Sequence, residues 1–440
     1  MSADPAREGK WAYRLFLLYL VSFFLHLPAR LPILGSIRFE VILVALISYQ
    51  IIVSKKPDGS KLDAASKYLI AILAYSFITL PFVEWPGSVI SSGFMEFIKG
   101  AIFYFFTVNL IITEKRLKVL ILVFLFCNLF RVLEPLYLHI TEGYLGSQTY
   151  LGVGEFAGRL SGAPSDVVNP NGLAFIIATI IPFFHYLLVS ANRKKTLCYL
   201  LLAPVLVYAM VLTLSRSGAL AIGIIASGIW LKSKHKITLA LIGIVGLGVI
   251  YANLSDVQRD RYLSIVSSDA RQSASAEGRL EGWTTDFRVA MNRPLLGHGL
   301  GTSREANWNV AGKDQISHIL WAEVWQEIGL IGLIIFVLYV KTIIQNFITA
   351  GRLVKEKLTS DDFLYRTVQA MQVWLLMNLL FSFASFGLKS YEWYFFGGLS
   401  VALYRLTVQR VEGERSIEIS ASKAVGFQRR PRIRRIRKRV

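Results

Sequence analysis

Predominantly apolar runs recur along this chain, each about 17 to 25 residues long, the length that an α-helix needs to cross a bilayer. The chain has 440 residues, of which 54% are hydrophobic and 13% aromatic. We therefore predict an all-α integral membrane protein with about twelve transmembrane helices. The expected spans are residues 11–27, 38–53, 67–83, 93–112, 117–137, 172–190, 196–214, 217–231, 237–254, 318–344, 368–388 and 391–408.

Lysine and arginine alternate between the loops that join these spans. The loops "SKKPDGSK", "TEKRLK", "NRKK", "KSKHK" and "GRLVKEK", together with both termini, are basic. Because cytoplasmic loops carry an excess of Lys and Arg, both termini are predicted to be cytoplasmic. The net charge of +19 is then largely a signal of topology. We expect the tail "RRPRIRRIRKRV" to bind anionic membrane lipids, and not nucleic acid, since basic arms of the latter kind usually belong to soluble proteins.

The chain is expected to form one membrane domain with an outer cap. Residues 1–254 hold spans one to nine, residues 255–317 form a short helical cap on the periplasmic side, residues 318–408 hold spans ten to twelve, and residues 409–440 form a disordered basic tail. Both cysteines, Cys127 and Cys198, lie within spans, which excludes a disulfide framework or a cysteine metal site outside the membrane. The sequence also lacks a P-loop and a His-Glu-x-x-His helix, so we expect neither a cofactor nor a metal.

The outer cap is rich in arginine. Residues 255–317 contain eight basic and eight acidic residues, and seven of the eight bases are Arg. The guanidinium group offers a planar fork of donors that matches phosphate and carboxylate. An anion site is therefore predicted here, with ordinary surface salt bridges as the alternative for each arginine.

Spans six, eight and ten each begin at the outer face, where the free N–H groups and the positive end of the helix dipole favour anions. The motif "NPN", which includes Asn171, opens span six, and "SRS", which includes Arg216, opens span eight. Span eight is only about 15 residues long, roughly 22 Å, so Arg216 should lie below the outer surface of a core about 30 Å thick. An arginine at membrane depth indicates a functional site, and a structural salt bridge to Glu134 or Asp166 is the alternative.

The segment "GRLEGWTTDFRVAMNRPLLGHGLG", residues 278–301, is predicted to begin as a helix. At 100° per residue its apolar face, expected to lie on the membrane domain, comprises Leu280, Trp283, Phe287, Ala290 and Met291. Arg279 lies at the edge of that face and Arg288 lies on the opposite side. Arg279 is therefore expected to face the site, and Arg288 to face solvent or the acceptor.

Glycines and histidines complete the predicted site. Gly297, Gly299 and Gly301 form a turn in which backbone N–H groups could approach a ligand. His318 opens span ten at the outer face and is the candidate base, with His298 as its rival. Two further histidines, His26 and His139, lie toward the outer face without an arginine motif beside them.

Four segments resemble the bacterial O-antigen ligase and O-antigen polymerase superfamily, enzymes of surface-polysaccharide assembly. They are "GRLSGAPSDVVNPNGLA", "LTLSRSGALA", "GRLEGWTTDFRVAMNRPLLGHGLG" and "SHILWAEVWQEIGLIG", in that order along the chain. The resemblance implies a metal-independent enzyme of the bacterial inner membrane. Such an enzyme moves a glycan from undecaprenyl pyrophosphate to an acceptor sugar or a lipid-linked acceptor, with its active site facing the periplasm.

By this resemblance Arg216, Arg279 and His318 match the family's functional residues. We expect Arg216 and Arg279 to bind the pyrophosphate, with Arg159 in support, and His318 to accept the proton of the incoming hydroxyl. Asn171, Arg288 and His298 are the further substrate-binding candidates. Direct displacement would invert the anomeric centre.

The sequence leaves ligase and polymerase open. Ile319 departs from the ligase pattern, whereas Gly329 and Gly332 keep its register, and the spacing from Arg288 to Gly299 is typical of polymerases. A transporter or flippase of a small anion or a lipid-linked sugar is the alternative function. It should place polar residues through the middle of the membrane, yet spans seven to nine are almost wholly apolar between their ends. A scaffold protein would have no reason to place arginines at outward helix starts.

Overall fold

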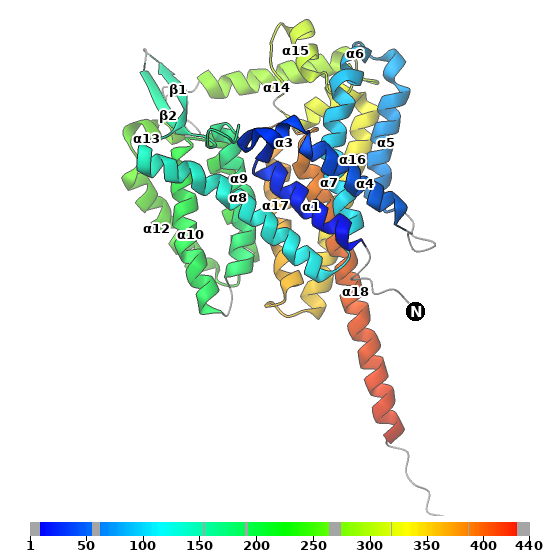
Figure 1. Ribbon diagram of the computed structural model, residues 1–440. Coiled ribbons are helices and arrows are strands. Elements are labelled where there is room, and N and C mark those ends of the chain that lie inside the picture. The colour runs from blue at the N-terminus through cyan, green and yellow to red at the C-terminus, as the bar shows by residue number, and fades with distance from the viewer. Residues whose placement is uncertain are drawn as a thin grey trace, which may run out of the picture.

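The computed structural model describes residues 9–54, 62–152, 155–189, 192–263, 274–317, 319–385 and 387–428, which are mostly helical (Figure 1). The helices of the first part are α1 (Lys10–Phe24), α2 (Leu27–Arg30), α3 (Pro32–Ser36), α4 (Phe39–Val53), α5 (Ala64–Ile78), α6 (Pro86–Ser88), α7 (Phe94–Leu110) and α8 (Glu114–Glu142). Those of the second part are α9 (Pro170–Leu188), α10 (Arg193–Leu212), α11 (Arg216–Lys232), α12 (Lys236–Asn253), α13 (Asp256–Leu263), α14 (Ala274–Asn292), α15 (Ser303–Ala311), α16 (Leu320–Lys357), α17 (Phe363–Phe381) and α18 (Tyr391–Gln428). One antiparallel hairpin, β1 (Gly146–Gly152) and β2 (Glu155–Leu160), departs from the predicted all-α class.

Every predicted span coincides with a helix of the structure, and the chain is a multi-pass membrane protein. Six helical segments in the described part are long and apolar enough to cross a membrane: Pro86–Leu110, Glu114–Glu142, Pro170–Leu188, Arg193–Leu212, Lys236–Asn253 and Leu320–Lys357. The apolar helices α4 and α5 are shorter. The count of twelve spans therefore stays a prediction.

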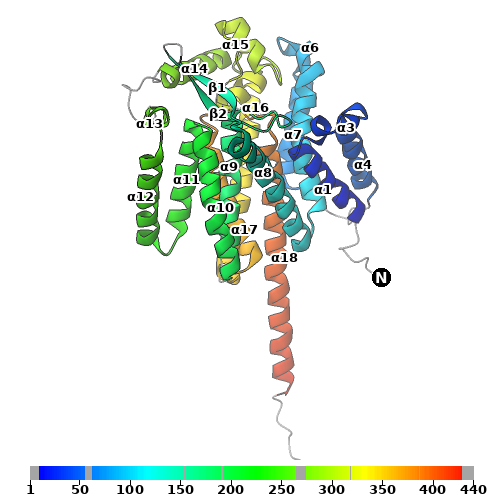
Figure 2. The same cartoon turned by 60° about the vertical axis from the view of Figure 1, so that its left-hand side comes forward.

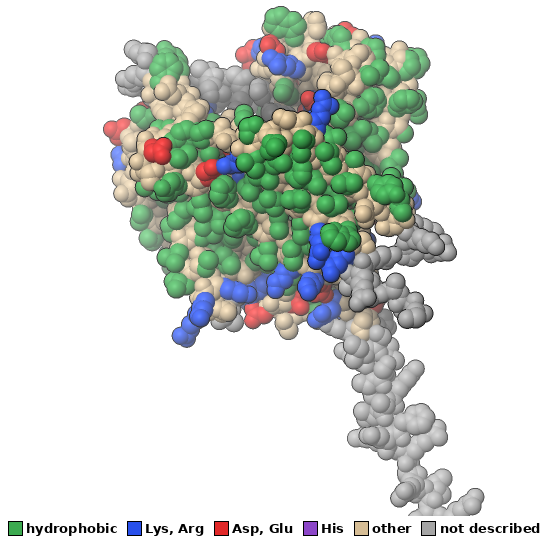
Figure 3. All heavy atoms as spheres, viewed as in Figure 1, with side chains coloured by type: hydrophobic (Ala, Val, Ile, Leu, Met, Phe, Trp, Pro, Cys, Tyr) green, Lys and Arg blue, Asp and Glu red, His purple; other side chains and the backbone are tan. Residues whose placement is uncertain are grey.

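Charge and apolar surface separate along the molecule. Figure 3 shows a broad hydrophobic face with Lys and Arg gathered along its lower edge, the edge from which α18 extends in Figure 1. The positive-inside rule would assign this edge to the cytoplasmic side, and the orientation of the termini stays a prediction. The backbone of α18 continues as a helix to Gln428, whereas the sequence favoured disorder after Gln409, and residues 429–440 lie outside the described part.

Aromatic side chains fill the centre of the bundle. Trp374 of α17 stacks on Phe396 of α18 with ring centroids 3.8 Å apart, and Phe124 of α8 stacks on Phe395 at 5.3 Å. Lipid tails are as apolar as these rings, so close packing, and not removal from water, is what favours helix association here. The core thus holds α8, α17 and α18 at fixed positions from which the outer loops depart.

The cap lies at the end of the bundle opposite the α18 extension. Figures 1 and 2 show α14 and α15 crossing this end, with the β1–β2 hairpin and α13 to one side. Within residues 255–317 the described part forms the helices α13, α14 and α15 with turns between α14 and α15 and after α15, and the periplasmic location of this cap stays a prediction.

The cap is fastened to α16 at a break in that helix. Gly329 has φ 67° and ψ −175°, so the helical path stops there and resumes at the next residue. The open backbone pairs with the turn after α14: Leu330 N donates to Pro294 O at 2.8 Å, and Gly299 N donates to Glu327 O at 2.9 Å. A β-carbon on Gly329 would lie 2.1 Å from Leu295 O, so only glycine fits this crossing.

We predict that Gly329→Ala destabilises the protein more than Gly312→Ala does. Gly312 has nearly the same backbone, φ 68°, but a β-carbon there would meet nothing within 4 Å. The control Gly312→Ala should therefore lower the free energy of unfolding by about 1–2 kcal/mol, the cost of the left-handed conformation. Gly329→Ala should lower it by about 1–3 kcal/mol more, because the added β-carbon overpacks the contact. Thermal unfolding of the two purified variants measures the difference, and equal melting temperatures would contradict the docking role of Gly329.

Candidate functional site

The corner between α10 and α11 is the centre of the candidate site. Ser215 caps α11, its Oγ accepting from Gly218 N at 3.2 Å, and Arg216 is the first residue of the helix and is buried. Leu214 before them has φ 50°, a left-handed conformation that costs a residue with a side chain about 1–3 kcal/mol. The corner therefore needs support from the segments around it.

Two buried arginines from distant segments supply that support. Arg159 of β2 donates through Nε to Thr213 O at 2.8 Å, and Arg261 of α13 donates through Nε to Leu214 O at 2.5 Å. These carbonyls lie at the negative end of α10, where cations are favoured. Two guanidinium groups from two distant segments thus bond to the corner that Arg216 adjoins.

Asn171 joins this corner to the start of α9. Its Oδ1 accepts from Arg159 Nη2 at 2.8 Å and from Ser215 Oγ at 3.0 Å. The capping role expected of "NPN" belongs to Asn169, whose Oδ1 accepts from Gly172 N at 2.8 Å. The positive ends of α9 and α11 are thus brought to the same arginine cluster, which favours an anion there.

Tyr262 lies next to this corner and is affected by its charge. Its hydroxyl donates to Val211 O at 3.3 Å. Burial raises the pKa of Tyr262 to about 12, although the nearby positive charges of Arg261 and Arg159 act to lower it. The phenol therefore stays neutral and adds no negative charge that would compete with a bound anion.

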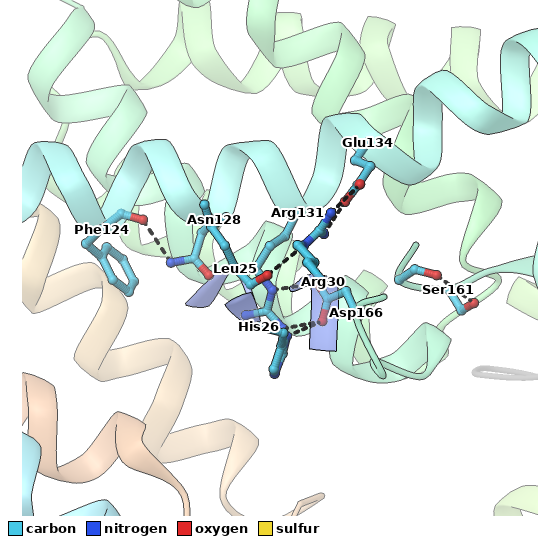
Figure 4. Close-up of polar contacts among 10 residues, drawn as sticks. Leu25, His26, Arg30, Phe124, Asn128, Arg131, Glu134, Ser161 and Asp166 are labelled. Atoms are coloured by element: carbon cyan, nitrogen blue, oxygen red, sulfur yellow. Dashed lines mark hydrogen bonds and ion pairs between the residues drawn. The ribbon is translucent and has the colours of Figure 1, made fainter. Parts of the chain in front are cut away.

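The two carboxylates considered as salt-bridge partners of Arg216 are engaged elsewhere. Figure 4 shows Glu134 facing Arg30 and Asp166 facing Arg131. Arg30 Nη1 donates to Glu134 Oε1 at 2.6 Å, and Arg131 donates to both oxygens of Asp166, at 2.7 and 3.0 Å. Both acids thus neutralise arginines outside the corner.

The segment forms the helix α14 where predicted, and its buried side overlaps the predicted apolar face only in part. Of that face, Ala290 is buried and Trp283 is partly buried, whereas Phe287 and Met291 are exposed. The buried side also includes Asp286, which accepts from Ser317 Oγ at 2.9 Å and from Asn307 Nδ2 at 3.2 Å. These hydrogen bonds allow a polar side chain to be buried. Arg288 is exposed, as expected, and the side chain of Arg279 lies outside the described residues.

His298 is fully buried inside the cap. Its Nδ1 lies 2.7 Å from Glu84 Oε2 and its Nε2 lies 3.1 Å from Val289 O, and its ring stacks on Trp85. Both ring nitrogens thus have protein partners, and the expected substrate contact of His298 stays a prediction.

The glycine turn also differs from its expected role. His298 N donates to Gln326 O at 2.7 Å, and Gly301 N donates to the Glu327 carboxylate at 2.7 Å. The backbone donors that the sequence assigned to a ligand are used to dock the cap on α16.

His318 lies outside the described residues, but its neighbours on both sides are held firmly. Ser317 is bonded to Asp286 of α14, and Leu320 N donates to Ser382 O and Ser385 O at 3.0 and 2.9 Å. One turn further along α16, the buried Glu323 accepts from Gly387 N at 2.8 Å and from Leu388 N at 3.0 Å. The start of α16 is therefore fixed to the cap on one side and to the turn between α17 and α18 on the other.

Sequence reasoning missed two arginines, one at the corner and one outside it. Arg261 was one of seven cap arginines with no motif to single it out, and only the fold brings it to Leu214. Arg131 lies in an apolar span, and a charge at that depth was a usable signal. Among the described residues, no group of His, Cys, Asp and Glu could hold a metal ion.

Part of the chain that includes this corner matches a known protein family. Residues 198–337 match the family model described as O-antigen ligase, which confirms the resemblance drawn from the sequence motifs. The matched region contains Arg216, Arg261, Arg279 and His318, whereas Arg159 and Asn171 precede it. No curated protein matches the chain. The family match indicates a glycosyl-transferring enzyme of the O-antigen ligase or polymerase type.

The pair of Arg131 and Asp166 gives a prediction about stability. Burial alone would raise the pKa of Asp166, but its contacts with His26 and Arg131 outweigh this and hold the pKa below its ordinary value. The pair's contribution should therefore be complete above about pH 4 and be lost as the pH falls through the lowered pKa. Asp166→Asn should lower stability by about 3–5 kcal/mol at neutral pH, because it leaves the Arg131 charge buried without a counter-ion.

Thermal unfolding of the purified protein between pH 3 and pH 7 measures both effects. The double variant Arg131→Gln/Asp166→Asn is the matched control, since it removes both charges and should recover much of the loss. A single variant as stable as the double variant would show that the buried charge is not the cause.

Proposed function

Because residues 198–337 match the O-antigen ligase family, we propose that this protein is a metal-independent, inverting glycosyltransferase. Its donor is a glycan on undecaprenyl pyrophosphate, and its acceptor is a sugar or a lipid-linked glycan. The reaction takes place on the periplasmic face of the bacterial inner membrane, with both termini cytoplasmic and the basic tail against anionic lipids. The observation that supports this most is the convergence of Arg159, Arg216 and Arg261 with the positive ends of α9 and α11.

The chemistry needs mainly a way to hold departing charge. As the acceptor oxygen bonds to the anomeric carbon, the bond from that carbon to the phosphate oxygen breaks, and its electron pair leaves with the pyrophosphate. Arginine forks and helix amino termini stabilise the growing negative charge without a metal. The corner 213–217, supported by two further arginines, suits this task.

The candidate residues divide into those that bind the pyrophosphate, a general base and a contact for the acceptor. Arg216 and Arg279 bind the pyrophosphate, with Arg159 and Arg261 in support. His318 accepts the proton of the acceptor hydroxyl. Arg288, exposed on α14, contacts the acceptor glycan or its carrier.

We predict that Arg216→Ala, Arg279→Ala and His318→Ala each lower glycan transfer. Loss of a general base usually costs about 10² to 10⁴ in rate, and loss of one charge-stabilising donor about 10² to 10³. The measurement is transfer in proteoliposomes that contain the protein, a lipid-pyrophosphate-linked glycan and an acceptor, with a chelator of divalent cations present. Wild-type transfer should be unaffected by the chelator.

Arg304→Ala is the control, because Arg304 is exposed and pairs only on the surface with Asp314 at 2.6 Å. It should transfer at the wild-type rate. Normal transfer by all three site variants, with normal folding, would refute the site. Loss of wild-type transfer on chelation would refute metal independence.

A further inference from the structure

His26, Asp166 and Arg131 form a chain of contacts that the reaction described above does not use. Arg131 of α8 donates two hydrogen bonds to the Asp166 carboxylate, and His26 Nδ1 lies 3.0 Å from Asp166 Oδ1 on its other side (Figure 4). The side chains of Arg131 and Asp166 are 7% and 1% exposed, whereas that of His26 is 39% exposed. The buried Arg131–Asp166 pair therefore contacts a partly exposed imidazole on the side of Asp166 that faces away from Arg131.

The carboxylate of Asp166 lies on the Nδ1 side of the His26 ring. Nδ1 is buried 3.0 Å from Asp166 Oδ1, an ion-pair contact whose angle is not that of a hydrogen bond. The nearby negative charge favours a proton on Nδ1, and a neutral ring with that proton carries a lone pair on Nε2. No hydrogen bond of Nε2 occurs within the described part of the chain. This is the arrangement by which a carboxylate orients a histidine toward a ligand.

The backbone gives no other reason for a histidine at this position. His26 has φ 50° and ψ 46°, left-handed, and it precedes α2 without a capping bond from its side chain. Glycine or asparagine would adopt this turn more easily. His26 thus carries backbone strain of about 1–3 kcal/mol. In the described part of the chain, the one polar contact of its side chain is with Asp166.

His26 contacts a loop that connects two parts of the proposed site. The loop that holds Asp166 joins β2, which carries Arg159, to α9, which carries Asn171, and both residues bond within the arginine corner. Phe24, two residues before His26, packs on Tyr391 at the start of α18, with centroids 5.2 Å apart. The segment just before Tyr391 bonds to Glu323 and Leu320 at the start of α16.

We propose that His26 binds the acceptor glycan, its Nε2 accepting a hydrogen bond from a sugar hydroxyl. The proposal rests on the proposed function. An ionised pyrophosphate offers only acceptor oxygens, which a neutral Nε2 lone pair cannot bind, whereas a sugar hydroxyl can donate. Asp166 is the positioning residue that sets the ring, and Arg131 holds Asp166.

The test compares His26→Asn with His26→Gln in the proteoliposome assay. The amide of Asn can replace Nδ1 toward Asp166 but does not reach the place of Nε2, whereas the longer Gln can place its amide oxygen near that point. We expect His26→Asn to keep the wild-type melting temperature but to raise KM for the acceptor about 3- to 10-fold, the worth of one hydrogen bond, with kcat and donor KM little changed. His26→Gln should recover most of the acceptor KM.

Every other result counts against the proposal. Wild-type kinetics in His26→Asn would mean that the imidazole only pairs with Asp166. A rise confined to the donor KM would assign the hydroxyl to the donor glycan, and unfolding of both variants would assign His26 a purely structural role. If the wild-type protein transfers no glycan, the proposed function itself is refuted. The wild-type protein is assayed before any variant, so this failure is distinguished from a failure of the His26 proposal.

Discussion

The break in α16 at Gly329 is the constraint on which the outer half of the molecule depends. A continuous helix would use its own N–H and C=O groups internally and would present only side chains to the cap. By stopping at Gly329 the helix exposes backbone donors and acceptors, and the turn after α14 pairs with them through Pro294 and Gly299. Backbone pairing is directional, so the cap has a defined height and rotation over the membrane bundle.

The start of α16 is also hydrogen-bonded to two loops. Glu327 accepts from Gly301 N in the cap, and Glu323, one turn earlier, accepts from Gly387 N and Leu388 N in the turn before α18. Two buried carboxylates on one side of a helix therefore join three parts of the chain that lie far apart in sequence. The start of α16, at Leu320, is therefore held by the same contacts.

The sequence was a good guide to the helices and a poor guide to the contacts between them. Each apolar run became a helix, because length and composition decide that within a bilayer. The face on which α14 packs was not predictable from periodicity, since Asp286 is buried only through partners such as Ser317 and Asn307. The glycines of "GHGLG" were correctly identified as special, but whether a close backbone approach serves a ligand or another helix depends on the fold.

The histidines show the same limit more sharply. His298 lies in a motif and is enclosed between Glu84 and Val289, while His26 lies in no motif and is held open by Asp166. A motif identifies a residue by its neighbours along the chain. Here the decisive neighbour is Asp166, which comes from the loop before α9 and is itself bonded to Arg131 of α8.

The buried arginines of this region differ in the partners that position them. A buried arginine is stable only with a partner. Glu134 accepts from Arg30 and Asp166 accepts from Arg131, whereas Arg159 and Arg261 donate to the backbone carbonyls of Thr213 and Leu214. These carbonyls orient two guanidinium groups at the corner where α11 begins, and the amino terminus of a helix favours an anion. That orientation is the physical reason to place the pyrophosphate at the corner before α11, and the carboxylate beside His26 is the reason to place a neutral sugar there.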